Sequence, residues 1–354
     1  MSRLPAGVLA AIQDGRVIPA HPLALHVDGS FDEQRQRALT RYYAAAGSGG
    51  LAVGVHTTQF AIRDPTIGLF ERVLAIAAEE MDRADARRAE PLIRIGGICG
   101  RTDQALDEAD LLARLGYHAG LLSLAAMADA DDAALVAHCA AVGARIPLVG
   151  FYLQPSVGGR PLSYAFWRRF ADIPALVAVK IAPFNRYQTL DVVRAVVDAG
   201  RDDIALYTGN DDAIVADLVT PFRFTIDGRM VERRIVGGLL GHWAVWTRSA
   251  VSLLDECRAA ARAGQIPAGL LQRGVEITDA NAAFFDAAHG FAGCIAGIQE
   301  VLRRQGLVRS ARCLSAGDAL SPGQAADIDR VCRAYPHLAD DEFVRAHLDE
   351  WLGC

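Results

Sequence analysis

A single lysine carries the clearest chemical signal in this sequence. Among the 36 Lys and Arg residues of the 354-residue chain, Lys180 is the one lysine. Arginine stays protonated in proteins, whereas a desolvated lysine amine can lose its proton and attack a carbonyl carbon. Lys180 ends the apolar run of residues 175–180, which is typical of a buried parallel strand. We therefore predict that Lys180 forms an imine with a ketone; codon bias or a buried, ion-paired structural lysine are the alternatives.

Hydroxyl-bearing residues end two other apolar runs. Tyr152 lies near the end of the run that precedes the one with Lys180, where a phenol can transfer protons to and from a reacting carbonyl oxygen. Thr57 and Thr58 follow the run of residues 50–55, and their hydroxyl and backbone N–H groups can hold a carboxylate. A core tyrosine and a common Thr-Thr pair at a strand end are the structural alternatives.

Eight apolar runs alternate with helical patterns along the chain. The runs cover residues 18–27, 50–55, 91–96, 119–124, 147–153, 175–180, 203–208 and 234–241. This rhythm predicts a (β/α)8 barrel, whose active site lies at the carboxyl ends of the strands. A doubly wound open sheet is the alternative, but its phosphate-binding G-x-G-x-x-G sequence after the first strand is absent.

We expect a barrel domain and a helical extension. Residues 1–265 are expected to form the catalytic barrel, with a short helix over residues 4–14 at its bottom and an insertion near residues 222–234. Residues 266–354 carry helical patterns without a low-complexity linker, so we expect a C-terminal helical region packed on the barrel.

Composition and motifs argue against several classes of protein. A net charge of −6 does not suit a nucleic-acid binder, and no run of 18 uncharged apolar residues predicts a membrane span. Seven scattered Cys without a C-x-x-C pair, and an N-terminus without a signal-peptide pattern, indicate a reduced, cytoplasmic protein. We expect no cofactor and no metal, because ligand motifs such as H-E-x-x-H are absent and only His26 and His56 lie at predicted strand ends.

These residues together resemble the dihydrodipicolinate synthase / N-acetylneuraminate lyase superfamily of class I (Schiff-base) aldolases. The resemblance covers about residues 18–310 and rests on Lys180, Tyr152-x-x-Pro155-Ser156, Thr57-Thr58 and Gly209-x-Asp211-Asp212. It implies a (β/α)8 TIM barrel with C-terminal helices. It also implies that Lys180 forms the imine, that Tyr152 relays protons, and that Thr57 and Thr58 hold the carboxylate of a 2-oxo acid.

The sequence departs from the superfamily pattern at several pocket positions. The arginine that often follows Pro-Ser is Val157, and the tyrosine that a neighbouring subunit supplies corresponds to Ala126 or Met127. Without these two groups, dihydrodipicolinate synthesis itself is not expected. Arg94 lies inside an apolar strand and therefore needs a carboxylate from the protein or from a ligand. The residues expected to choose the substrate are His56, Gln59, Arg63, Arg94, Gln154, Asn185 and Asn210. Solvation at the rim or a structural hydrogen bond is the alternative for each of them. Gly238 allows close approach of a ligand or of another backbone.

The sequence thus predicts a Schiff-base-forming lyase, an aldolase or a hydro-lyase, whose partners are a 2-oxo acid such as pyruvate or a 2-keto-3-deoxy sugar acid and, for an aldolase, an aldehyde. A non-catalytic or weakly catalytic sugar-acid binding protein on the same barrel is one alternative. A metal-dependent barrel hydrolase or isomerase is another. The habit of the superfamily predicts a homo-oligomer, a dimer or a tetramer.

Overall fold

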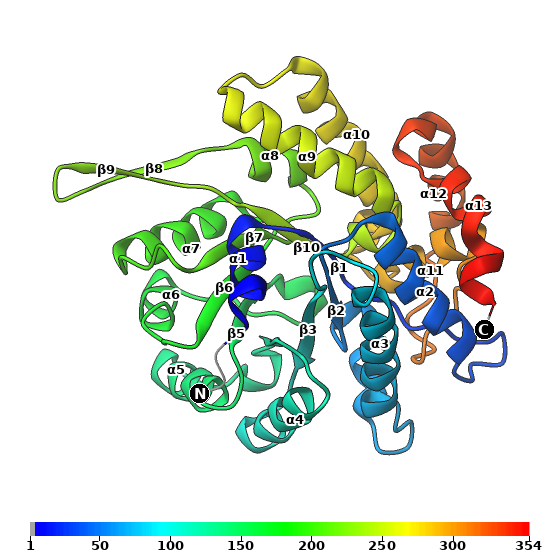
Figure 1. The fold of residues 1–354 in the computed structure, drawn as a ribbon, viewed down its shortest axis with the longest axis horizontal. Helices are drawn as coiled ribbons and strands as arrows, with labels where there is room; N and C mark the ends of the chain where they lie inside the picture. The colour runs from blue at the N-terminus through cyan, green and yellow to red at the C-terminus, as the bar shows by residue number, and fades with distance from the viewer. Residues whose placement is uncertain (1–3, 354) are drawn as a thin grey trace.

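The computed structural model describes residues 4–353 and shows eight parallel strands around a nearly closed barrel (Figure 1). The strands follow the order β1-β10-β7-β6-β5-β4-β3-β2, and a bridge between Ala20 and Ala52 joins the two ends. They are β1 (Val17–Pro19), β2 (Gly50–Val53), β3 (Ile93–Ile98), β4 (Ala119–Leu122), β5 (Leu148–Leu153), β6 (Leu176–Ala182), β7 (Ala205–Thr208) and β10 (Gly237–Leu240). Each predicted apolar run overlaps one of these strands, and the predicted (β/α)8 TIM barrel is confirmed.

The side chains of each strand alternate between two apolar cores. In β5, Val149 and Phe151 belong to the cluster inside the barrel, whereas Leu148 and Tyr152 belong to the cluster between the sheet and the helices. Successive residues of a strand point to opposite faces. Both faces of the barrel wall are covered, which is why the strands read as continuous apolar runs in the sequence.

The short helix α1 (Ala6–Asp14) leads directly into β1 and fills the barrel from below. Val8, Ala11 and Ile12 pack against the interior side chains of the strands, and the Tyr207 hydroxyl donates to the Ile12 carbonyl at 2.8 Å. Because this end is filled, a ligand cavity is left at the carboxyl ends of the strands, the end at which barrel enzymes carry their active sites.

Helices follow the strands and form the outer layer of the barrel (Figure 1). Several begin at a side chain that caps the first turn: the Asp32, Asp131 and Ser163 side chains each accept a hydrogen bond from a backbone N–H there. The helices are α2 (Glu33–Ala46), α3 (Phe70–Asp85), α4 (Thr102–Arg114), α5 (Asp132–Gly143), α6 (Tyr164–Phe170), α7 (Arg186–Asp198), α8 (Ile214–Val219) and α9 (Thr247–Ala263). Short 3₁₀ helices are η1 (His56–Thr58), η2 (Phe60–Arg63), η3 (Ala125–Met127), η4 (Pro155–Val157), η5 (His242–Ala244), η6 (Ala287–His289) and η7 (Pro336–Leu338).

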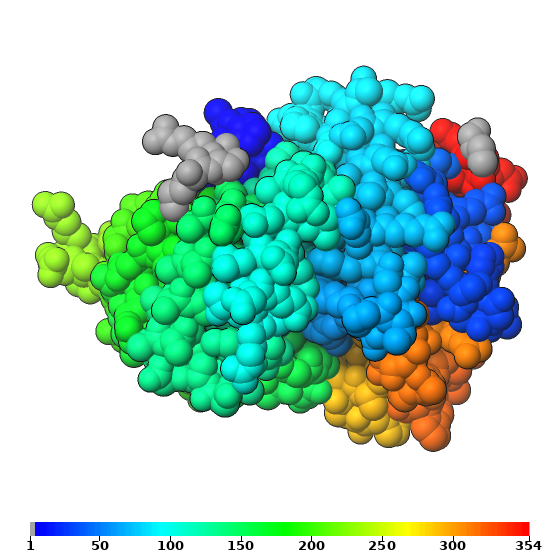
Figure 2. Space-filling view, turned by 90° about the horizontal axis from the view of Figure 1, so that it is seen from below, coloured from blue at the N-terminus to red at the C-terminus, as the bar shows by residue number. Residues whose placement is uncertain are grey.

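Four further helices follow α9. They are α10 (Ala268–Phe284), α11 (Cys294–Arg304), α12 (Gln324–Ala334) and α13 (Asp341–Leu352). Among them α10 packs against α8 and α12, and α13 packs against α2. In Figure 2 the orange and red C-terminal segments lie against the blue segment that contains α2. Polar contacts join them, since the Tyr42 hydroxyl donates to Asp340 at 2.7 Å and Arg41 donates to the Trp351 carbonyl at 2.7 Å.

A two-stranded antiparallel hairpin precedes the last barrel strand. Its strands are β8 (Phe222–Ile226) and β9 (Arg229–Arg233), and it extends away from the barrel at the left of Figures 1 and 2. Asp227 and Gly228 form the turn, both with positive φ, as a tight hairpin turn requires. The segment that we predicted as an insertion is therefore a projecting hairpin.

No helix within residues 4–353 is long and apolar enough to cross a bilayer. Across the same residues, His, Cys, Asp and Glu side chains do not gather in groups of three that suit a metal ion.

Candidate active site

Lys180 points from β6 into a narrow cavity at the carboxyl ends of the strands. It is paired with Phe151 of β5 and Tyr207 of β7, and both neighbours also face the barrel interior. Lys180 is only 8% exposed. The cavity has a volume of about 60 Å³ and is lined by Ala20, Val55, His56, Thr57, Phe151, Leu153, Gln154, Val157, Lys180, Ala182, Phe184, Gly209, Asp211, Gly241, Phe285, Phe291 and Cys294.

The surroundings of Lys180 favour its uncharged form. Burial lowers the pKa of Lys180 from 10.5 to about 8, while the negative charge of Asp211 limits the fall. The amine lies 4.5 Å from the centre of the Phe151 ring. Within residues 4–353 it has no hydrogen bond and no ion pair, although it lines a cavity. An amine that is desolvated, unpaired and next to open space is well placed to react with a carbonyl compound.

A glycine keeps the space beside Lys180 open. A Cβ atom built on Gly209 lies 2.7 Å from the Lys180 Cε and 2.7 Å from the Ala182 Cβ, closer than side chains tolerate. Any larger residue at position 209 therefore displaces the lysine side chain. Gly209 follows β7 directly, so Gly209 and Asp211 of the sequence pattern Gly209-x-Asp211-Asp212 form this wall of the cavity, whereas Asp212 does not line it.

The two predicted carboxylate-binding threonines lie in different places. Thr57 lines the cavity, whereas the Thr58 side chain points away from it. The Thr58 hydroxyl accepts from the backbone N–H groups of Gly54 and Val55 and donates to the His21 carbonyl at 2.6 Å. Its hydrogen-bonding capacity is thus used to fix the turn after β2, which corrects the predicted role of the Thr58 side chain. Thr57 lines the cavity and remains the candidate.

His56 also lines the cavity, as predicted. Burial lowers its pKa to about 4, with the nearby Lys180 acting in the same direction. His56 is therefore neutral near pH 7, so it can donate or accept a hydrogen bond but cannot pair with a carboxylate as a cation. Gln154, the last predicted residue that reaches the cavity, contributes an amide at the end of β5.

Tyr152 does not meet Lys180, contrary to the sequence-based prediction. Its ring packs on Trp167 in the outer core at a centroid distance of 5.3 Å. Its hydroxyl accepts from the Leu162 N–H at 3.1 Å and donates to the Leu162 carbonyl at 3.3 Å. Because side chains alternate along β5, Phe151 faces the lysine and Tyr152 faces the helices.

This placement predicts that Tyr152→Phe leaves the reaction of Lys180 with a ketone unchanged. The loss of the hydroxyl should instead cost roughly 1–3 kcal/mol of stability, because the buried Leu162 N–H loses its acceptor. Urea unfolding measures the second effect, and the rate of imine trapping measures the first. A tenfold fall in the trapping rate of a folded Tyr152→Phe protein contradicts the placement.

The other predicted substrate-binding residues have structural partners outside the cavity. Each makes a contact of its own within the protein, which agrees with the structural alternative to substrate binding. Two arginines form ion pairs: Arg94 with Asp82 and Asp85, both at 2.7 Å, and Arg63 with Glu108. Three amide side chains make hydrogen bonds: Gln59 accepts from the Leu314 N–H, Asn185 caps α7, and Asn210 bonds to Phe184, Thr189 and Asp217. The absence of a side chain at Gly238 leaves space for Trp243. For Arg94, the required carboxylate comes from the protein itself.

The sequence reasoning missed the contributions of two segments to the cavity. Asp211 was part of the recognised pattern but received no role, although two acidic residues just after a barrel strand were a usable signal. Phe291 comes from the C-terminal region and meets Phe184 edge to face at a centroid distance of 5.7 Å. Both phenylalanines have positive φ values of 71° and 52°, which is uncommon for bulky residues and typical of functional sites.

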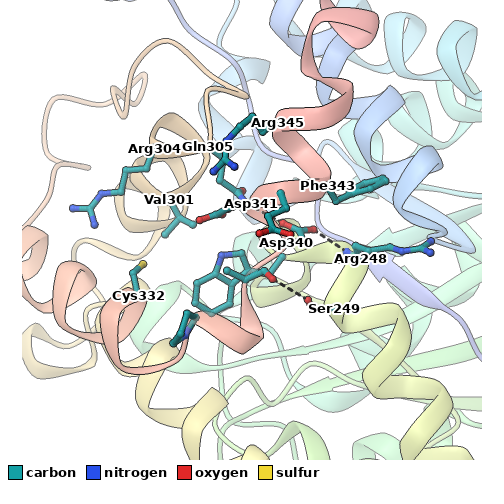
Figure 3. Close-up of a pocket in the computed structure, with 14 residues that line it drawn as sticks. Arg248, Ser249, Val301, Arg304, Gln305, Cys332, Asp340, Asp341, Phe343 and Arg345 are labelled. Carbon is teal, nitrogen blue, oxygen red and sulfur yellow. Dashed lines mark hydrogen bonds between the residues drawn. The ribbon is translucent and has the colours of Figure 1, made fainter.

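A larger hollow of about 680 Å³ lies among α9, α11, α12 and α13 (Figure 3). Several of its polar groups have protein partners: Arg304 pairs with Glu300, and Asp340 accepts hydrogen bonds from the Arg248 N–H and from Gln305. It shares no residue with the Lys180 cavity. We therefore place the candidate chemistry at the smaller cavity.

Comparison with known proteins supports the resemblance predicted from the sequence. Over 198 residues the chain is 27% identical to the 4-hydroxy-tetrahydrodipicolinate synthase of Aromatoleum aromaticum, a match that covers 54% of this chain and 62% of that protein. The match thus spans less than two thirds of the relative's length. No family model matches the chain.

Solved structures share the fold over nearly the whole chain. Dihydrodipicolinate synthase from Acinetobacter baumannii, complexed with pyruvate, superposes with a TM-score of 0.70 at 16% identity over 91% of this chain and 98% of its own. N-acetylneuraminate lyase from Fusobacterium nucleatum gives a TM-score of 0.68 at 14% identity over 92% of this chain and 99% of its own. The sequence match and the shared barrel agree at the level of the superfamily.

Proposed function

We propose that this chain, a member of the dihydrodipicolinate synthase / N-acetylneuraminate lyase superfamily, is a Schiff-base-forming lyase that acts on a small 2-oxo acid. The observation that carries this proposal is the amine of Lys180, which is buried and unpaired beside a cavity. A buried cation without a partner costs free energy, so its retention points to a chemical use.

The reaction begins with attack of the neutral amine on the keto carbon. Loss of water then gives an imine, which withdraws electrons from the neighbouring carbon and permits bond cleavage, addition or dehydration there. Thr57 lines the cavity, and its hydroxyl is the group that would hold the carboxylate of the 2-oxo acid. His56 and Gln154 are the further polar groups available to orient the substrate.

The size and lining of the cavity favour a donor as small as pyruvate over a 2-keto-3-deoxy sugar acid. A volume of about 60 Å³ holds several waters, far less than the cavities of drug-sized ligands. Val157, at the position of the superfamily arginine, contributes an apolar wall. This lining supports a function other than dihydrodipicolinate synthesis, since the second carboxylate of that reaction has no guanidinium there.

A non-catalytic or weakly catalytic 2-oxo-acid binding protein is the second candidate. The outward orientation of Tyr152 favours it, because the expected phenolic proton relay is missing from the cavity. The predicted dimer or tetramer stays a prediction for either function.

Reductive trapping tests the proposal. Incubation with pyruvate and borohydride is expected to add one adduct, with the mass of pyruvic acid less one oxygen atom, to the intact protein. A panel of 2-oxo acids identifies the donor, and a simple ketone without a carboxylate is the matched control that should label far more slowly. Labelling without turnover of any aldehyde or 2-keto-3-deoxy acid supports the binding protein, whereas the absence of an adduct with every 2-oxo acid overturns both functions.

A further inference from the structure

A second ionisable group, Asp211, lines the cavity together with Lys180. The carboxyl oxygen Oδ1 of Asp211 accepts a hydrogen bond from the His242 N–H at 2.9 Å. The main-chain carbonyl of Asp211 accepts another from the Asn281 side chain at 2.7 Å. Within residues 4–353, Oδ2 has no hydrogen-bond partner. The residue is 7% exposed. Asp211 is therefore a fixed carboxyl group with one oxygen left free.

The environment keeps the proton affinity of Asp211 high. Burial raises the pKa of Asp211 well above its ordinary value of 3.8, while the His242 N–H and the Lys180 charge oppose the rise. A carboxyl group whose pKa is raised in this way can give a proton as well as take one. Lys180 and Asp211 form a pair whose two ionisations lie close together and influence each other.

Other ionisable groups near the cavity are less suited to proton transfer. Burial keeps His56 neutral, with a pKa of about 4, and raises the pKa of the Cys294 thiol. The buried His242 also has a pKa of about 4, and its ring stacks on Phe284 rather than lining the cavity. Phe151, which faces Lys180 where a phenol was expected, has no proton to transfer.

We propose that Asp211 is the catalytic acid and base of the imine chemistry, in the role that the superfamily pattern assigned to Tyr152. This inference rests on the proposed function. The neutral amine first adds to the keto carbon and forms a carbinolamine. The protonated carboxyl of Asp211 then gives its proton to the carbinolamine hydroxyl. The C–O bond breaks and water departs, so that an iminium ion and the Asp211 carboxylate remain. The carboxylate then removes a proton from the adjacent carbon, which yields a neutral enamine and restores the acid.

Exchange of the pyruvate methyl protons tests the proposal without a second substrate. In D2O, each cycle of imine and enamine formation replaces methyl hydrogen with deuterium, which proton NMR records. In Asp211→Asn, which keeps an oxygen for the His242 N–H, we expect exchange to fall about 100-fold or more, the scale of a lost general acid–base group. Asp211→Glu should recover part of the rate. The neighbouring Asp212, whose side chain is exposed, supplies the matched control, and Asp212→Asn should exchange within twofold of the unaltered protein.

The same variants separate this inference from the proposed function. Borohydride should still label Lys180 in Asp211→Asn. Its labelling should have a lower pH midpoint, because the negative neighbour that favours the ammonium form is gone. Exchange at the unaltered rate in Asp211→Asn overturns the role of Asp211 while leaving the imine intact. Absence of both label and exchange in the unaltered protein overturns the proposed function instead. If Asp211→Asn does not fold, the exchange rate of Asp211→Glu decides. Retention of a measurable part of the unaltered rate supports carboxyl chemistry. Loss of exchange in a folded Asp211→Glu protein that still labels contradicts it.

Discussion

Replacement of Lys180 by alanine is expected to abolish reductive labelling and to reduce turnover on the order of 10⁴-fold or more, because the covalent intermediate can no longer form. The chain contains one lysine, so a lysine-bound adduct has a single possible position. Mass spectrometry of the borohydride-treated protein measures the adduct, and the exchange of pyruvate methyl protons measures the chemistry.

Two further substitutions separate the nucleophile from its charge and its volume. Lys180→Arg keeps a positive charge but cannot lose its proton, so it should fail to label. Lys180→Met keeps most of the volume and removes a buried amine without an ion pair, so its melting temperature should equal or exceed that of the unaltered protein. A lysine that only stabilises the fold predicts the reverse: retained activity in Lys180→Arg and a lower melting temperature in Lys180→Met.

Replacement of Arg63 by methionine should destabilise the barrel by roughly 3–5 kcal/mol, because it leaves a buried carboxylate without its partner. The Arg63 and Glu108 side chains are 9% and 8% exposed and meet at 2.9 Å. Arg63 also donates to the carbonyls of Gly54 and Gly97 at 3.0 and 2.9 Å, and its guanidinium lies 4.0 Å from the centre of the Phe70 ring. The pair therefore ties together the ends of β2 and β3 beside the cavity.

Urea unfolding of matched variants measures this effect. The double variant Arg63→Met/Glu108→Leu should regain much of the lost stability, because no unpaired charge is left. The exposed pair Arg168–Asp172 is the control, and Arg168→Met should cost less than about 1 kcal/mol. A loss below about 1 kcal/mol for Arg63→Met contradicts the structural role and restores Arg63 as a candidate for substrate binding.

The fold was predictable because its signals are local. Buried parallel strands read as short apolar runs, and these runs identified all eight barrel strands. They also placed Lys180 near the carboxyl end of β6, although β6 continues to Ala182. The side on which each residue lies was harder to predict. Phe151 and Tyr152 are adjacent aromatics, and a shift of one residue exchanges the inner and outer faces. The motif pointed to the tyrosine, but the pairing of Phe151 with Lys180 gives the inner position to the phenylalanine.

Contacts between distant segments account for the other differences. Thr58, Arg94 and Asn210 looked available to a ligand, yet partners elsewhere in the chain use their hydrogen-bonding groups. Phe291 enters the cavity wall from the C-terminal region, more than a hundred residues after Phe184, its partner in the wall. Sequence spacing does not encode such contacts. The acidic pair after β7 did carry a local signal, but its chemical value depends on the burial of Asp211 beside Lys180.

The pH dependence of labelling at Lys180 tests most directly whether this amine is desolvated and reactive. The rate of reductive labelling by pyruvate, followed by peptide mass over a range of pH, reports the fraction of neutral amine. Burial lowers the pKa of Lys180, so the account predicts a midpoint clearly below the ordinary lysine value of 10.5. A midpoint near 10.5, the ordinary value for a lysine in water, contradicts the account, as does the failure of Lys180 to label at any pH.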